Sequence, residues 1–207
     1  MGNYLNEIFN SSKNSENENL KNETKIILEC APLIFGLRLA NIINITRAEF
    51  VNLKKIFFDS DLSFYVISTT KDRLSLLFYR KNNLSEYFSK PKTKELLEEF
   101  GYDTGDMYGM MYTFSLRYRK YINKKAYFPH EMGLFLGYPV EDVEGYINND
   151  GKNSLAVGYW KVYEGVNEKI KLFEKFEEAK ETLTYLVYKG MNINEIVRMF
   201  YYRRNVS

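Results

Sequence analysis

The chain has 207 residues, enough for one domain with a substantial core. Its 29 basic and 27 acidic residues leave a formal charge of +2, so the large basic excess typical of nucleic-acid-binding proteins is missing. One Cys and one His exclude a disulfide framework and a zinc site built from Cys and His side chains. The 18 Tyr and 15 Phe have two explanations, a bias toward AT-rich codons or a recognition surface.

The chain ends and hydropathy predict a cytoplasmic protein with no membrane partner. No window reaches the roughly 18 apolar residues that a transmembrane helix needs. Residues 1–20 are polar, lack the apolar centre of a signal peptide, and are expected to form a flexible arm. The lone Cys30 is typical of a reducing compartment.

The first ordered elements are expected between residues 20 and 57. A short helix is expected to end near Cys30, and the apolar run 33–37 after Pro32 is short enough for a buried strand. Thr46 and Glu49 have the spacing of a capping box, which predicts a helix that starts there.

A central antiparallel hairpin is the strongest strand prediction. The runs 63–68 and 74–79 are rich in β-branched and aromatic residues and are joined by a short polar connection. Because both of their faces are apolar, we expect helices to cover the hairpin on both sides.

The remainder of the chain is mostly helical in pattern. Pro91 and Gly101 mark the start and end of one helix. The stripe from Met107 to Tyr121 predicts a second helix whose methionines fill the core. A strand is expected at 155–163, followed by a long helix capped by Asn167 that ends at Gly190, and by a last helix over 192–203. These elements predict a single α+β domain over residues 21–207.

Residues 130–147 have the spacing of a helix–turn–helix. Gly133 is the small residue where two helices would touch, Gly137 would form the turn, and Pro139 would start the second helix. That second helix carries acidic residues between 141 and 144 and no basic ones, so it would repel the phosphates of DNA. We therefore expect the geometry without DNA binding, and we interpret Glu141, Asp142 and Glu144 as a solvated acidic face rather than as metal ligands.

Two alternative functions rest on single features. The segment 117–125 interleaves Arg and Lys with Tyr, as single-stranded RNA surfaces do, although a solvated basic helix end explains it better. Cys30 and His130 are the only thiol–imidazole pair available to an enzyme, but a buried structural cysteine is the simpler interpretation. No phosphate-binding loop, dinucleotide fingerprint or nucleophile elbow occurs.

The segment from Phe128 to Ile147, together with Gly151–Asn153 and Gly158–Tyr163, resembles the signature of domain-of-unknown-function family 3793. The resemblance extends upstream to Cys30-Ala-Pro and the hairpin. It implies a bacterial protein but no activity or cofactor. Members tend to have His where this chain has Glu29, and often Cys where it has Val157, so paired Cys and His chemistry is disfavoured here.

If members of this family share a binding site, we expect it where these neighbouring motifs bring polar groups and aromatic rings together. We expect a non-catalytic binding or interaction module whose partner is a small molecule or a protein. The candidate binding residues are His130, Glu131, Tyr138, Lys152, Trp160, Lys161 and Tyr163.

Overall fold

The structure is a computed structural model that describes residue 24 and residues 27–205, with side chains described as far as residue 202. The predicted flexible arm, residues 1–20, lies outside the described residues. The chain is helical at Thr24 and from 27 to 29, in agreement with a helix that ends near Cys30.

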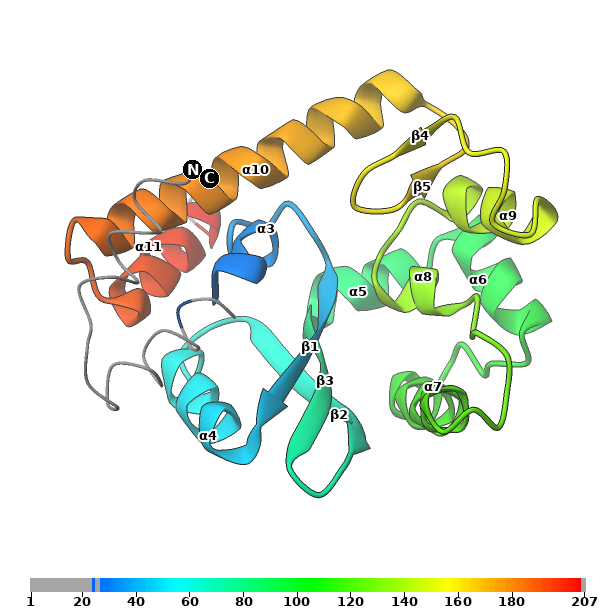
Figure 1. Cartoon of the computed structure of the whole chain (residues 1–207), viewed down its shortest axis with the longest axis horizontal. Coiled ribbons are helices and arrows are strands. Elements are labelled where there is room, and N and C mark those ends of the chain that lie inside the picture. Colours follow the sequence, from blue (N-terminus) through cyan, green and yellow to red (C-terminus); the bar gives the residue numbers. More distant parts are fainter. Residues whose placement is uncertain (1–23, 25–26, 206–207) are drawn as a thin grey trace.

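A three-stranded antiparallel sheet lies at the centre of the fold (Figure 1). Its strands are β1 (Ala40–Thr46), β2 (Leu62–Thr69) and β3 (Arg73–Arg80), in the order β1-β3-β2. The predicted hairpin is therefore confirmed as β2 and β3, with an irregularity in register between Val66 and Ser68.

Both faces of this sheet are buried, each against a different apolar core. Along β3, Leu74, Leu76 and Phe78 point to the first core, whereas Leu77 and Tyr79 point to the second. This alternation follows from the two-residue period of a strand. It explains why the hairpin sequence is apolar on both faces, as expected for a strand covered on both sides by helices.

Helices α3 (Ala31–Ile34), α4 (Arg47–Ile56), α10 (Val166–Tyr188) and α11 (Ile193–Asn205) surround the first core. The capping box at the start of α4 is confirmed. The Thr46 hydroxyl accepts from the Glu49 amide at 3.2 Å, and the Glu49 carboxylate accepts from the Thr46 amide at 2.6 Å.

The strand expected at 33–37 is wrong, because this segment forms α3 and the turn after it. Pro32 lies in the first turn of α3, where its missing N–H costs nothing. The carbonyls of Leu33 and Ile34 are satisfied by the buried guanidinium of Arg80 rather than by a neighbouring strand. The strand that the sequence reasoning missed is β1.

The second core is packed by α5 (Lys81–Phe88), α6 (Pro91–Glu99), α7 (Met107–Ile122), α8 (Met132–Phe135) and α9 (Val140–Asn148). Met110 and Met111 are each 2% exposed, which confirms their role as core filling. Phe114 stacks on Phe135 at 4.2 Å between ring centres and so joins α7 to α8.

The strand expected at 155–163 is two short strands, β4 (Ala156–Val157) and β5 (Lys161–Val162), paired antiparallel. The chain reverses after Gly158, whose amide donates to the Trp160 carbonyl at 3.0 Å. Helix α10 then starts after Gly165, whose left-handed backbone (φ +59°) forms the N-cap in place of the predicted Asn167. Figure 1 shows α10 running from this hairpin to α11.

These elements confirm the predicted α+β class. Among the described helices, none has the length and apolar character that crossing a bilayer requires.

Candidate functional site

The helix–turn–helix geometry predicted for residues 130–147 is present as α8 and α9. A Cβ added to Gly133 would lie 2.8 Å from Val143 Cγ2, so this glycine allows the two helices to touch. Gly137 has φ +71° in the turn, where a side chain would also meet Leu39 at 2.7 Å. The pair thus depends on both glycines, as the sequence suggested.

The interpretation of α9 as a solvated acidic face is wrong for Asp142, which is 2% exposed. Its carboxylate accepts hydrogen bonds from Trp160 Nε1 at 2.8 Å, from the Tyr163 amide at 2.7 Å and from the Glu164 amide at 3.3 Å. Buried carboxylates are stabilised by such donors. Asp142 therefore attaches the β4–β5 hairpin to α9.

Lys169, in the first part of α10, completes this polar network. Its ammonium lies 2.6 Å from Glu141 Oε1 and 3.8 Å from Asp142 Oδ2. Burial alone would lower the pKa of Lys169, but the hydrogen bond to Glu141 and the charges of the surrounding acids together hold that pKa above its ordinary value. Burial likewise raises the pKa of Glu141, and the hydrogen bonds it accepts from Lys169 and from the backbone, together with the nearby lysine charges, bring it below the ordinary value. Of the three acids, Glu144 is the exposed one.

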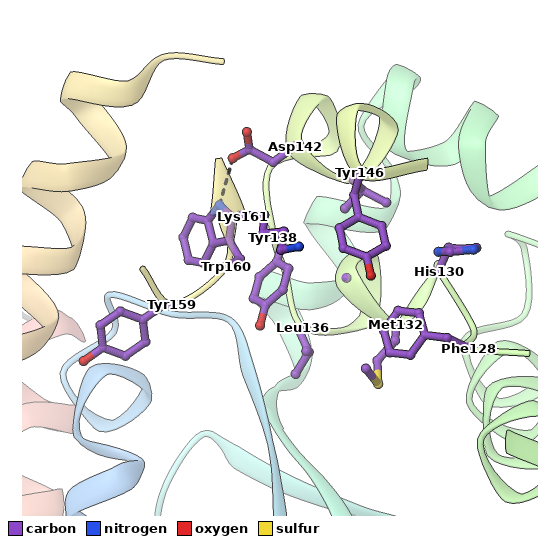
Figure 2. Close-up of a pocket in the computed structure, with 12 residues that line it drawn as sticks. Phe128, His130, Met132, Leu136, Tyr138, Asp142, Tyr146, Tyr159, Trp160 and Lys161 are labelled. Atoms are coloured by element: carbon purple, nitrogen blue, oxygen red, sulfur yellow. Dashed lines mark hydrogen bonds between the residues drawn. The ribbon is translucent and has the colours of Figure 1, made fainter. Parts of the chain in front are cut away.

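An aromatic pocket of about 200 Å³ opens between α8, α9 and the hairpin. Tyr138 and Trp160 form one wall, stacked with ring centres 4.8 Å apart and planes inclined by 26°. Phe128, His130 and Tyr146 form the other, with ring centres 5.6–6.2 Å apart. Figure 2 shows these two groups of rings on either side of the pocket.

Two polar groups distinguish this pocket from a simple apolar cavity. The ammonium of Lys161, on β5, donates to the Gly151 carbonyl at 2.6 Å and lies 5.8 Å from the centre of the Tyr146 ring. His130 Nδ1 is buried and has no hydrogen-bond partner within the described part of the chain. Both residues belong to the pocket lining.

Four of the seven candidate binding residues line this pocket, namely His130, Tyr138, Trp160 and Lys161. Glu131 does not. It is 3% exposed and accepts hydrogen bonds from Arg117 and from the Tyr102 hydroxyl, each at 3.0 Å. Burial and the neighbouring Glu131 carboxylate raise the pKa of Tyr102 well above its ordinary value. This cluster ties α7 to α8.

Lys152 and Tyr163 also lie outside the pocket lining. Lys152 is exposed. Tyr163 packs against α9 at Gly145, where an added Cβ would come within 2.4 Å of the tyrosine Cβ. The sequence reasoning missed Phe128 and Tyr146 as lining residues, although both belong to the segment that carries the family resemblance. Tyr146 follows Asp142 by four residues, so one helix face carries both the hairpin anchor and a pocket wall.

The structure separates the residues of the thiol-enzyme alternative. Cys30 is 1% exposed in the first core, and burial raises its pKa to about 12. Its thiol contacts Asn41, with 3.8 Å between Nδ2 and Sγ. The ring contacts of His130 are with Phe128 and Tyr146, and within the described ranges no interaction joins it to Cys30.

The arginines of the basic stretch 117–125 are both hydrogen-bonded within the protein. Arg117 is half-buried, binds Glu131 and donates to the Phe100 carbonyl at 2.7 Å. Arg119 is exposed, but its guanidinium donates to the Ser115 hydroxyl at 2.8 Å. The RNA alternative is therefore weakened at Arg117, which already binds a carboxylate, whereas Arg119 and the lysines of this stretch remain exposed to solvent. Among the described residues, no group of three or more His, Cys, Asp or Glu side chains is placed to hold a metal ion.

Comparison with known proteins agrees with the resemblance seen in the motifs. The family model described as "Protein of unknown function (DUF3793)" matches residues 26–197, which include both cores, the hairpin and every pocket residue. No curated protein matches the chain, and no solved structure does. The match covers well over half of the sequence, and the chain belongs to the DUF3793 family of proteins of unknown function.

Proposed function

We propose that this protein is a cytoplasmic, non-catalytic binding module whose partner is a small planar molecule held in the aromatic pocket. The observation that carries the proposal is the pocket itself, in which rings from two separate segments face one space. Aromatic side chains are the residues that most often line ligand sites, where they bury area and stack on flat molecules.

The size of the pocket indicates the size of the ligand. An apolar cavity of about 150 Å³ accommodates benzene, whereas pockets for drug-sized ligands occupy about 300–1,000 Å³. At about 200 Å³, this pocket fits a molecule of one ring or two fused rings. A folded partner protein would require a broader surface than this concave space.

Binding rather than catalysis is supported by the state of the acidic groups near the pocket. Asp142 and Glu131 are both engaged by donors within the protein, so neither is free to accept a proton from a substrate. The thiol of Cys30 lies in the first core, away from the pocket lining. Its free, reduced form is compatible with a reducing compartment.

The single tryptophan provides a direct test, because Trp160 is the only Trp in the chain and forms a pocket wall. We expect a panel of planar one- and two-ring compounds to include members that change its fluorescence saturably. Tyr146→Ala should weaken their binding about fivefold, because a ring that stacks on the ligand contributes roughly 1 kcal/mol.

The matched control is Tyr127→Ala, which removes a neighbouring tyrosine that is 97% exposed. Both variants are first compared with the wild type by thermal unfolding, so that lost binding is not mistaken for lost folding. If no compound in the panel gives a saturable change, or if Tyr127→Ala weakens binding as much as Tyr146→Ala, the pocket is not the binding site.

A further inference from the structure

Three partly buried cations of the fold are each paired with an acid. Lys169 faces Glu141, Arg117 faces Glu131, and Lys180 faces Glu177, with N–O separations of 2.6–3.1 Å. Each of these cations thus has its charge balanced by an acid.

Lys161 is positioned by the protein but is not neutralised by it. Its ammonium is fixed by the Gly151 carbonyl and by the face of the Tyr146 ring, and no acid pairs with it among the described residues. An ammonium has three N–H donors, and the Gly151 carbonyl takes one of them. Two donors and a full positive charge remain available beside the pocket.

Arg38 adds a second unbalanced cation behind the Tyr138 wall. Its guanidinium lies 5.5 Å from the centre of the Tyr138 ring and donates to the Tyr138 hydroxyl at 3.2 Å. Arg38 Nε is buried without a hydrogen-bond partner, and no carboxylate in the described ranges pairs with this residue. Arg38 as a whole is half-buried, and an anion bound nearby would supply the counter-charge that it lacks.

The carboxylate among the pocket-lining residues does not cancel this charge. Asp142 is the one acid among them, and its two oxygens already accept three hydrogen bonds from the hairpin. Lys169 lies 3.8 Å from Asp142 Oδ2, although its closer partner is Glu141 at 2.6 Å. Lys161 is therefore the pocket-lining residue that carries a positive charge with no acid paired to it among the described residues.

We propose that the ligand is a compact aromatic acid, whose ring lies between the two aromatic walls and whose carboxylate is bound by Lys161 in the field of Arg38. This inference rests on the proposed function and names the chemical class that the site selects. The apolar walls strengthen the charge interaction, because Coulomb energy increases as the surrounding dielectric falls. The ring supplies contact area, and the carboxylate supplies selectivity over neutral molecules of the same shape.

The test compares benzoate with benzamide, two probes of nearly equal shape that differ in charge. Binding to the full chain is followed by Trp160 fluorescence at low salt. We expect benzoate to bind about tenfold more tightly than benzamide, and we expect added salt to reduce the difference because it screens the charges. Lys161→Met should remove most of the difference, because it should weaken benzoate binding much more than benzamide binding. Lys152→Met, which removes an exposed lysine outside the pocket lining, is the control.

The outcomes separate the two proposals. Equal binding of the two probes, or tighter binding of benzamide, overturns the aromatic acid and leaves the proposed pocket in place. If Lys161→Met weakens both probes equally, the lysine only supports the pocket wall, and the inference is likewise overturned. If neither benzoate nor benzamide binds while neutral two-ring compounds do, selection for an acid fails as well. Failure of the whole compound panel overturns the proposed function itself.

Discussion

The two antiparallel sheets of this protein are held in place by different forces. The three-stranded sheet has strands of seven or eight residues, and both of its faces are covered by apolar cores. The β4–β5 hairpin has two residues in each strand, and Val157 and Leu155 are 72% and 66% exposed. Hydrophobic burial stabilises the first, whereas hydrogen bonds to Asp142 and the packing of Trp160 hold the second.

This difference shows that the large sheet and the hairpin beside the pocket are stabilised in separate ways within one chain. The hairpin buries too little to order itself, since an isolated two-stranded hairpin is marginal in water. Trp160 supplies part of the missing apolar contact. Its ring stacks on Tyr138 and meets Phe173 edge-on, with 4.6 Å between the centres of the Trp160 and Phe173 rings. The five predictions below test this contrast, from the largest expected effect to the smallest.

Cys30 tests how well the surroundings of the large sheet exclude solvent. Its pKa is raised from 9.0 to about 12 by burial, so below pH 9 the reactive thiolate is at least about a thousandfold scarcer than in the unfolded chain. We expect a thiol-specific reagent to label the native protein slower than the unfolded protein by at least this factor. Labelling at equal rates would show that the first core is open.

The same shift predicts a dependence of stability on pH. The folded thiol stays protonated up to about pH 12, whereas the unfolded thiol loses its proton above pH 9.0. The contribution of Cys30 to stability is therefore complete below pH 9 and decreases between pH 9 and 12. Cys30→Ala should remove this part of the alkaline loss, measured as the difference between urea denaturation curves of the two proteins.

Phe78→Ala should damage the large sheet severely. Phe78 is 1% exposed, stacks on Phe64 at 4.3 Å and contacts Phe57 edge-on at 4.8 Å. Truncating a buried Phe costs about 3–5 kcal/mol of unfolding free energy, because contacts are lost and a cavity remains. Urea denaturation measures the loss. The control, Phe58→Ala, removes a ring that is 83% exposed and should change stability by about 0.5 kcal/mol or less.

Asp142→Asn should release the small hairpin with a smaller effect on the fold. The amide group that replaces one carboxylate oxygen is a donor, and it would face the Trp160 indole N–H or the backbone amides that now donate to Asp142. We expect a loss of about 1–3 kcal/mol and greater quenching of Trp160 fluorescence by acrylamide. Glu144→Gln on the same helix is the control, because Glu144 is exposed. Unchanged quenching in Asp142→Asn would show that the carboxylate does not hold the hairpin.

Val157→Ala should have the smallest effect of the five. Because Val157 is 72% exposed on β4, we expect a change of about 0.5 kcal/mol or less in unfolding free energy. Thermal and urea denaturation both detect larger changes. A loss well above 1 kcal/mol would indicate that this strand is packed rather than solvated, and the contrast between the two sheets would fail.

Local signals explain which elements could be predicted from the sequence. The capping box, the β2–β3 hairpin and the start of α6 at Pro91 depend on residues within a few positions of one another. The short apolar run at 33–37 is ambiguous by nature, because such a run suits a buried strand or a buried helix turn. Strand β1 became visible only in the structure, where its partner β3 lies more than 25 residues away in the sequence.

The site was predicted in part for the same physical reason. Gly133, Gly137 and the aromatic segments have recognisable spacing, and four of the proposed binding residues indeed meet in one pocket. Asp142 could not be predicted, since an acidic residue beside other acids is usually solvated. Its burial depends on three donors from a hairpin more than fifteen residues further along the chain.

Completion of the pocket depends on the docking of helix α10. With 23 residues it is about 35 Å long, and it binds α9 through Lys169 near its start and enters the first core through Ala179 and Leu183 further on. A chain that has formed its large sheet but has not yet docked α10 lacks the contacts of Lys169 with α9, which help to hold the hairpin against that helix. The pocket is therefore complete only when the C-terminal third of the chain has been placed.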